Sequence, residues 1–200
     1  MIILILDPHG DDWLWCAGEI KRRIDSGDMI YYVRFGLSKD PAFDIISEVS
    51  NSLKEIGINN IDSYDFPIRN FCNHRQEILD ILISYRNELK PDIVYTPSRS
   101  DVHQDHKVIC HESIRAFSKL SSIFGYDMPW NTLDSMINRY VKLTEKELQK
   151  KIDCASYYKS QLKNNNNCTT SNFLKSLAVV RGNRINVEYA EAYEVIVLRD

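Results

Sequence analysis

An unbroken apolar run at residues 1–6 (MIILIL), followed by a polar turn and a helical pattern, constrains the fold of this chain most. A strand that is apolar on both faces needs cover on both sides, which a parallel sheet between helices supplies. Comparable strand-like runs follow at 29–35, 92–96 and 122–126, separated by apolar residues at helical spacing. This alternation predicts an α/β fold with a mostly parallel central sheet.

The same patterns predict the other elements. Helices are predicted at 13–26, 41–57, 75–89, 105–118, 144–162 and 171–180, the fifth opening on a capping box of Thr144 and Glu147. Weaker strands are predicted at 61–66, 136–143 and 192–198. Residues 69–74 are expected to form a polar loop, and the asparagine tract 164–167 an exposed turn. Because no repeat or domain boundary stands out, we expect residues 1–200 to form a single domain.

Composition limits the class of protein. The chain has 200 residues, is 44% hydrophobic and carries a net charge of -3 without a basic stripe, so nucleic acid is not the expected partner. The cysteines include no CxxC pair, which indicates reduced thiols in a cytoplasmic protein; they lie at positions 16, 72, 110, 154 and 168. The longest pure apolar run, residues 1–6, is too short for a signal peptide or a membrane span.

Two polar clusters each follow a strand-like run. Residues 7–12 (DPHGDD) follow the first run, and residues 103–106 (HQDH) follow the run at 92–96. The carboxyl ends of parallel strands are where ligands bind in such sheets. His9, Asp12 and His106 together offer two imidazoles and one carboxylate, which leaves a fourth position of a tetrahedral zinc site open for water. Zinc in such a site would lower the pKa of that water to about 7.

Other polar side chains of the two clusters suit supporting roles. Asp11 is expected to point away from the cation and is a candidate general base. His103 is a candidate donor to a developing oxyanion. Asp105 is a candidate to accept a ring N–H of a neighbouring histidine and so hold that ring in place. The alternative is structural, because Asp11 and Asp12 are also typical of a helix N-terminus. His74 and His111 are not expected to take part, and no nucleotide-binding or serine-hydrolase motif is present.

At these residues the sequence resembles the PIG-L (LmbE-like) family of zinc-dependent N-acetylglucosamine deacetylases. Residues 8–13 (PHGDDW) resemble the opening motif of the family, with Gly10 in place of its usual proline and Trp13 in place of its usual acidic residue. Residues 97–106 resemble its second motif, and residues 189–194 (YAEAYE) its closing segment. The resemblance implies a Rossmann-like three-layer fold.

The resemblance also implies roles for individual residues. His9, Asp12 and His106 match the metal ligands, Asp11 the general base, and His103 the residue that stabilises the tetrahedral intermediate. Arg69 falls where the family often places a substrate-contacting arginine. The implied cofactor is Zn²⁺ or another divalent metal, and the implied reaction is removal of an N-acetyl group from a small amino-sugar substrate.

Two other functions stay open at this stage. The chain is alternatively a catalytically silent module that binds a sugar or a partner, or a metal amidase acting on a non-sugar amide. The intact set of polar residues argues against the silent module. The sequence allows a homo-oligomer and does not identify the sugar carrier.

Overall fold

The computed structural model describes residues 1–37, 42–132, 134–163 and 169–199. Its strands are β1 (Ile2–Asp7), β2 (Met29–Arg34), β3 (Asn60–Ser63), β4 (Ile93–Pro97), β5 (Ser122–Tyr126), β6 (Arg139–Leu143) and β7 (Tyr189–Val197). Its α-helices are α1 (Ala17–Asp25), α2 (Ile45–Ile56), α3 (Arg75–Leu89), α4 (Gln104–Phe117), α5 (Glu145–Ala155), α6 (Lys159–Lys163) and α7 (Ser171–Asn183). Two short 3-10 helices, η1 (Asp12–Cys16) and η2 (Phe71–His74), precede α1 and α3.

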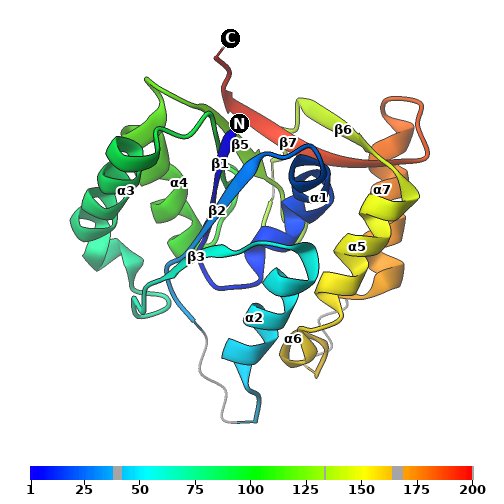
Figure 1. Ribbon diagram of the computed structural model, residues 1–200, viewed down its shortest axis with the longest axis horizontal. Coiled ribbons are helices and arrows are strands. Elements are labelled where there is room, and N and C mark those ends of the chain that lie inside the picture. The colour runs from blue at the N-terminus through cyan, green and yellow to red at the C-terminus, as the bar shows by residue number, and fades with distance from the viewer. Residues whose placement is uncertain (38–41, 133, 164–168, 200) are drawn as a thin grey trace.

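The described strands form one seven-stranded sheet in the order β3-β2-β1-β4-β5-β7-β6. The first five strands pair in parallel, and β7 runs antiparallel to both of its neighbours. Helices α3 and α4 cover one face of the sheet, and α1, α2, α5 and α7 cover the other (Figure 1). The predicted three-layer α/β fold with a mostly parallel sheet is confirmed.

Strand β1 shows why this sequence needs two helical layers. Ile3 and Ile5 pack into the core on the α1 and α2 side, and Leu4 and Leu6 into the core beneath α3 and α4. All four side chains are fully buried. Each contributes about 1.5–3 kcal/mol by leaving water, so neither face of the strand tolerates exposure.

The helix predicted at 144–162 is two helices in the structure, α5 and α6, because the chain turns after Ala155. The Thr144–Glu147 capping box starts α5 as predicted. At the turn, the Ser156 hydroxyl donates to the Asp153 carbonyl (2.6 Å), and Tyr158 turns inward until it is buried. The tertiary contacts of Tyr158 therefore override a continuous helical pattern.

Several other boundaries differ from the prediction. The helix predicted from residue 13 opens with the 3-10 turn η1, and η2 occupies part of the predicted loop 69–74. Strand β3 is shorter than 61–66 because it pairs with β2 only along four residues, whereas β7 begins earlier than 192 and α7 continues beyond 180. The predicted helix start at Pro41 and the predicted turn at 164–167 lie outside the described residues.

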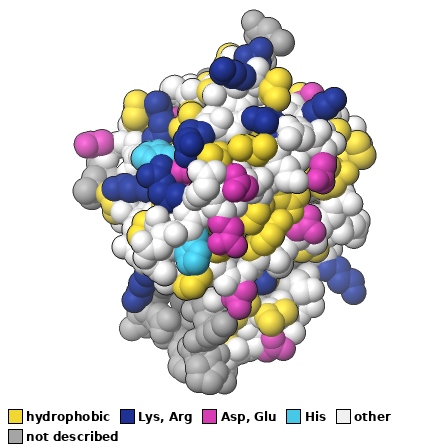
Figure 2. Space-filling model, turned by 90° about the vertical axis from the view of Figure 1, so that its left-hand side faces the viewer, with side chains coloured by type: hydrophobic (Ala, Val, Ile, Leu, Met, Phe, Trp, Pro, Cys, Tyr) yellow, Lys and Arg dark blue, Asp and Glu magenta, His cyan; other side chains and the backbone are white. Residues whose placement is uncertain are grey.

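The surface carries charges of both signs. On the face that α3 and α4 cover, Lys and Arg side chains lie among Asp and Glu, with hydrophobic side chains between them (Figure 2). Within the described ranges, none of the helices combines the length and the apolar character that crossing a membrane requires. Cys16, Cys72, Cys110 and Cys154 are free thiols, and Cys168 lies outside the described residues.

Candidate metal centre and active site

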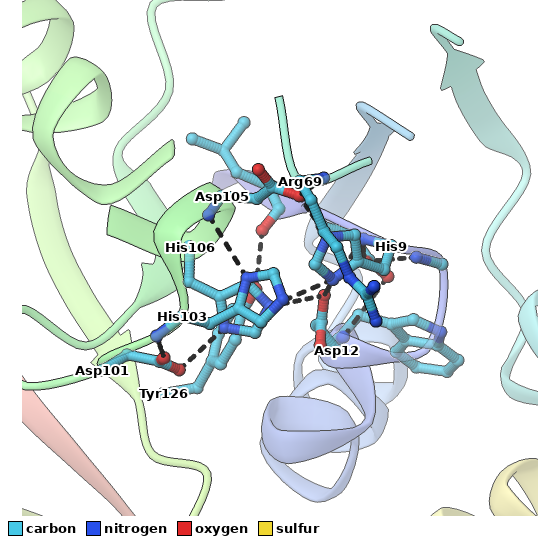
Figure 3. Close-up of polar contacts among 12 residues, drawn as sticks. His9, Asp12, Arg69, Asp101, His103, Asp105, His106 and Tyr126 are labelled. Carbon is cyan, nitrogen blue, oxygen red and sulfur yellow. Dashed lines mark hydrogen bonds and ion pairs between the residues drawn. The ribbon is translucent and has the colours of Figure 1, made fainter. Parts of the chain in front are cut away.

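The two polar clusters meet where β1 and β4 lie side by side. Their strands pair in parallel, and the sheet order reverses here, since β2 lies on one side of β1 and β5 on the other side of β4. Such a reversal leaves a crevice at the carboxyl ends of the strands. Nδ1 of His9 lies 3.1 Å from Nε2 of His106, although 97 positions separate them in the sequence. The predicted approach of the two imidazoles is therefore present in the structure (Figure 3).

Asp12 completes a tight group of three ligand atoms. Its Oδ2 lies 3.3 Å from Nδ1 of His9 and 3.4 Å from Nε2 of His106. Ligand atoms about 2 Å from a tetrahedral Zn²⁺ lie about 3.3 Å from one another, so the three atoms have the spacing that one small cation needs. Asp12 and His106 are buried and His9 is nearly so, which makes the three groups costly unless a positive charge lies among them.

His103 lies beside the same group. The ring nitrogens of His9, His103 and His106 include a set of three within 4.8 Å of one another, so a three-histidine site is a second possible arrangement. The carboxylate of Asp12 lies closer to His9 and His106 than the 4.8 Å that bounds the three-histidine set. Moreover, Nδ1 of His103 is engaged elsewhere, because it accepts the backbone N–H of Asp105 (3.2 Å) at the start of α4.

A buried carboxylate holds the far nitrogen of each imidazole. Oδ2 of Asp105 lies 3.0 Å from Nε2 of His9, and Oδ2 of Asp101 lies 2.7 Å from Nδ1 of His106 (Figure 3). Such contacts fix the ring orientation and strengthen a histidine as a ligand. The structure thus places Asp105 against His9, far away in sequence, and Asp101 against His106. Sequence reasoning missed Asp101, although its position in the loop before the HQDH cluster is a signal that could have identified it.

Asp7, the last residue of β1, is a second group that sequence reasoning missed. Its fully buried carboxylate accepts the backbone N–H groups of His9 (2.9 Å), Gly10 (2.7 Å) and Trp13 (3.3 Å). The hydroxyl of Tyr32 donates to it as well (2.9 Å). Four donors on one carboxylate fix the path of the turn and therefore the position of His9. A carboxylate that ends a wholly apolar strand is the sequence signal for such a role.

The pKa values show a strong preference for positive charge among these groups. Burial opposes protonation of His9, but Asp12 and Asp105 raise the pKa of its imidazole to about 10. Burial likewise opposes protonation of His106, but Asp12 and Asp101 raise its pKa to about 9. A divalent cation would supply the positive charge that the protons supply in its absence, so the residues present fit such a cation.

Asp11 and His103 line the cavity beside the three ligand atoms. Burial, with repulsion from Asp12 and Asp7, raises the pKa of Asp11 to about 7. Burial, with repulsion from His106 and His9, lowers the pKa of His103, so its ring is neutral. Because Nδ1 of His103 accepts a hydrogen bond, the proton of the neutral ring is on Nε2, where it is free to be donated.

The cavity above these groups has a volume of about 420 Å³, within the range of small-molecule sites. Arg69 lies at it, with a positive φ of 65°, and its backbone N–H donates to Oδ2 of Asp105 (2.6 Å). Trp13 does not line it: the indole is fully buried and donates to the hydroxyl of Tyr158 (2.9 Å), which donates to the carbonyl of Gly10 (2.7 Å). Through Tyr158, Trp13 therefore stabilises the turn that carries His9 and Gly10 from the side of the protein core.

A mostly parallel sheet with a two-histidine, one-carboxylate group at its switch point defines an α/β protein with a candidate catalytic metal centre. Comparison with known families is more specific. The PIG-L family model, described as GlcNAc-PI de-N-acetylase, matches residues 4–118. These residues are more than half of the chain and include both polar clusters, and the chain therefore belongs to the PIG-L family. No curated protein sequence matches the chain.

Solved structures share the whole fold at low identity. The N,N'-diacetylchitobiose deacetylase from Pyrococcus horikoshii is 22% identical with a TM-score of 0.79, and the match covers 98% of this chain and 83% of that one. Teicoplanin deacetylase Orf2 is 14% identical with a TM-score of 0.78, and both chains are covered fully, at 100%. GalB, the 4-carboxy-2-hydroxymuconate hydratase of Pseudomonas putida KT2440, is 15% identical with a TM-score of 0.78. The match covers 100% of this chain and 97% of GalB. At these identities the likeness shows the fold alone.

Proposed function

We propose that this protein is a divalent-cation-dependent hydrolase that removes the N-acetyl group from an N-acetylglucosamine-type amino sugar or sugar conjugate. The observation that carries the proposal is the approach of three ligand atoms, from His9, Asp12 and His106, to within 3.1–3.4 Å of one another beside a cavity. Membership of the PIG-L family, whose model is described as GlcNAc-PI de-N-acetylase, supports the reaction. Two structures that share the fold are named as deacetylases, one of N,N'-diacetylchitobiose and one of teicoplanin.

His9, Asp12 and His106 would hold the cation. Two nitrogens and one oxygen suit Zn²⁺, although other divalent ions accept the same donors. When bound, the cation supplies Lewis acidity, which polarises the amide carbonyl and makes water more acidic. Asp101 and Asp105 act through the two histidines, because each holds the ring nitrogen that faces away from the cation.

The remaining residues move protons and stabilise charge. Asp11 accepts a proton from the water that attacks the acetyl carbon, as general base. His103 donates its Nε2–H to the carbonyl oxygen while negative charge develops there. The C–N bond then breaks while the amine nitrogen takes up the proton that Asp11 accepted, and acetate and the free amino sugar leave. Arg69 lines the cavity, where its guanidinium would contact the sugar.

The candidate site draws its lining from residues as far apart as His9 and Gln161. We therefore propose that residues 1–200 act as one catalytic domain. A cut of the chain between the two polar clusters would separate the ligands from one another.

A turnover assay combined with metal analysis tests the function. Acetate release is measured on N-acetylglucosamine, N,N'-diacetylchitobiose and an acetyl-lysine peptide, before chelation, after chelation and after return of Zn²⁺. We expect release from the sugars, loss with the chelator and recovery with the metal. Asp11→Asn should retain the metal and lose about 10²–10⁴-fold of kcat.

Other results would contradict the proposal in distinct ways. Turnover of the peptide alone would indicate a non-sugar amidase. Sugar binding by calorimetry without acetate release from any substrate would indicate a silent binding module. Full activity in Asp11→Asn would remove Asp11 from its role as the base.

A further inference from the structure

Trp130 differs from the other two tryptophans in its exposure. Trp13 and Trp15 are buried at 0% and 2%, whereas 41% of Trp130 is exposed. Trp130 lines the same cavity as the candidate metal centre, in the segment that follows β5. A large flat apolar side chain beside a ligand cavity is the kind of group that contributes most to binding energy.

The segment that carries Trp130 is held in place by its neighbours. The N–H of Asn131 donates to the carbonyl of Met128 (2.9 Å), and the carbonyl of Asn131 accepts the N–H of Val102 (2.9 Å). Asp101 and Thr132 form an antiparallel bridge. The segment is thereby tied to the loop that carries Asp101 and leads to His103. These contacts place the backbone next to Trp130 beside the loop that leads to the candidate catalytic groups.

Trp15 supports the indole of Trp130 from inside the protein. The two rings meet edge to face, with centroids 5.0 Å apart and an interplanar angle of 74°. On its other sides Trp15 contacts the ring of Phe173, at 6.4 Å between centroids, and the Nζ of Lys151, 5.3 Å from its own ring. The indole of Trp130 therefore packs against a buried ring on one side while the rest of it stays exposed.

The other residues that line this cavity indicate what kind of ligand it takes. Ile45 and Ile68 are half-buried and supply apolar surface, whereas Val49 and Met128, which also line the cavity, are 5% and 1% exposed. Among the described lining residues, Arg69 is the one side chain with a permanent positive charge. A diphosphate or other highly charged carrier would find few cations here, whereas a ring with an apolar face would find a matching surface.

We propose that Trp130 is a platform for a second ring of the substrate, so that the preferred substrate is an N-acetyl amino sugar joined to another ring with a flat apolar face. That ring is a second sugar or an aromatic group. It would pack against the exposed indole while the acetamido group lies at the His9–His106 pair. This inference rests on the proposed deacetylase function and specifies its substrate class.

The experiment compares one-ring and two-ring substrates. The specificity ratio, kcat/KM for a two-ring substrate divided by kcat/KM for N-acetylglucosamine, is measured with N,N'-diacetylchitobiose and with a phenyl β-glycoside of N-acetylglucosamine. The proteins are wild type, Trp130→Ala, Trp130→Phe and a control, Leu120→Ala, which alters a residue that is 57% exposed and outside the cavity. The two two-ring substrates separate a sugar from an aromatic partner.

We expect wild type to prefer at least one two-ring substrate and Trp130→Ala to lower that ratio about five- to tenfold, mainly through KM. Trp130→Phe should restore most of the preference, and Leu120→Ala should keep the wild-type ratio. An unchanged ratio in Trp130→Ala, or no two-ring preference in wild type, would overturn the inference.

Calorimetry with the same ligands keeps this result separate from the proposed reaction. If no substrate releases acetate, the deacetylase function fails. In that case, tighter binding of two-ring ligands that depends on an aromatic residue at position 130 would still support the platform. Equal binding of one-ring and two-ring ligands would overturn it.

Discussion

Gly10 carries the sharpest backbone demand in the candidate site. Its φ is +101°, and its N–H donates to Oδ1 of Asp7 (2.7 Å). Proline fixes φ near −65° and has no N–H. We therefore expect Gly10→Pro, which would introduce the usual residue of the family motif, to destabilise the protein by about 2 kcal/mol or more. Urea unfolding monitored by circular dichroism measures the change.

Two alanine variants separate the causes at Gly10. A Cβ at Gly10 would lie 2.9 Å from Cγ2 of Val49, whereas a Cβ at Gly27, where φ is +82°, would meet nothing within 4 Å. Gly27→Ala thus measures the backbone strain alone, about 1–2 kcal/mol. Gly10→Ala should exceed it because of the crowding. Equal effects of the two substitutions would show that Val49 moves aside freely.

Asp101 is expected to determine how tightly the metal is held. It accepts from the ring of His106 (2.7 Å) and from the backbone N–H of His103 (2.8 Å). Asp101→Asn should weaken metal affinity about 10–100-fold while the far-ultraviolet circular dichroism spectrum stays that of wild type. Competition with a chromogenic chelator gives the affinity. Wild-type affinity in Asp101→Asn would mean that the ring of His106 is oriented by packing alone.

The sequence predicts the polar groups at this site better than their partners. His9 and Asp12 lie in the turn after β1, and His106 lies in the first turn of α4, after the loop that follows β4, so the fold itself brings them to one edge of the sheet. The hydrogen-bond partners of the two imidazole rings depend on the conformation of loops, which the hydrophobic periodicity of the sequence does not predict. Asp105 could be predicted to hold a histidine, but only the structure places it against His9, 96 positions away in the sequence.

The N-terminus of α1 depends on a carboxylate from β7. Glu191 accepts the backbone N–H groups of Gly18 (2.9 Å) and Glu19 (2.7 Å) and pairs with the buried Nζ of Lys151 (2.7 Å). Glu191→Gln would leave the ammonium of Lys151 buried without a counter-charge, so we expect a loss of about 3–5 kcal/mol in the free energy of unfolding. The midpoint of urea unfolding gives the value.

A double variant tests the origin of that loss. Lys151→Met removes the unpaired charge, and the Lys151→Met, Glu191→Gln protein should therefore be more stable than Glu191→Gln alone. If the double variant is less stable than the single one, the contribution of Glu191 is its capping of α1 and not its ion pair.

At the scale of elements, local pattern predicts the parallel half of the sheet and fails near the C-terminus. Strands β1 to β4 are each followed by a helix, and this alternation is the local pattern that predicts a parallel sheet. Strand β7 instead inserts between β5 and β6, a long-range pairing that no short window contains. The break between α5 and α6 has a similar cause, because the bond from Tyr158 to the carbonyl of Gly10 spans 148 positions.

At the scale of the whole molecule, buried ion pairs link distant elements and make stability depend on pH. Glu19 of α1 is buried and accepts from Arg139 of β6 at 2.6 and 2.7 Å. Burial alone would raise the pKa of Glu19, but the hydrogen bonds and charge of Arg139 lower it below its ordinary value of 4.5. The unfolded chain therefore binds a proton on Glu19 at a higher pH than the folded protein does.

The sign of the effect follows from this order of pKa values. The contribution of Glu19 to stability is fully present well above pH 4.5 and is lost as the pH falls through the lower, folded pKa. The difference in unfolding free energy between wild type and Glu19→Gln should accordingly shrink as the pH falls from 7 toward 3. Urea unfolding across this range gives both curves, and a constant difference would contradict a contribution from the charge.

A bound cation would join two parts of the chain that lie 97 positions apart, the turn after β1 and helix α4. Because the unfolded chain cannot hold these ligands together, the cation should stabilise the folded state by about 2.7 kcal/mol when it is free at 100 times its Kd. For a protein of this size that corresponds to about 5–11 °C in Tm, which a chelator should remove. His106→Ala is the matched control, since its Tm should be the same with the metal and with the chelator. An equal metal-induced rise in His106→Ala would place the stabilising cation elsewhere and separate metal binding from the proposed reaction.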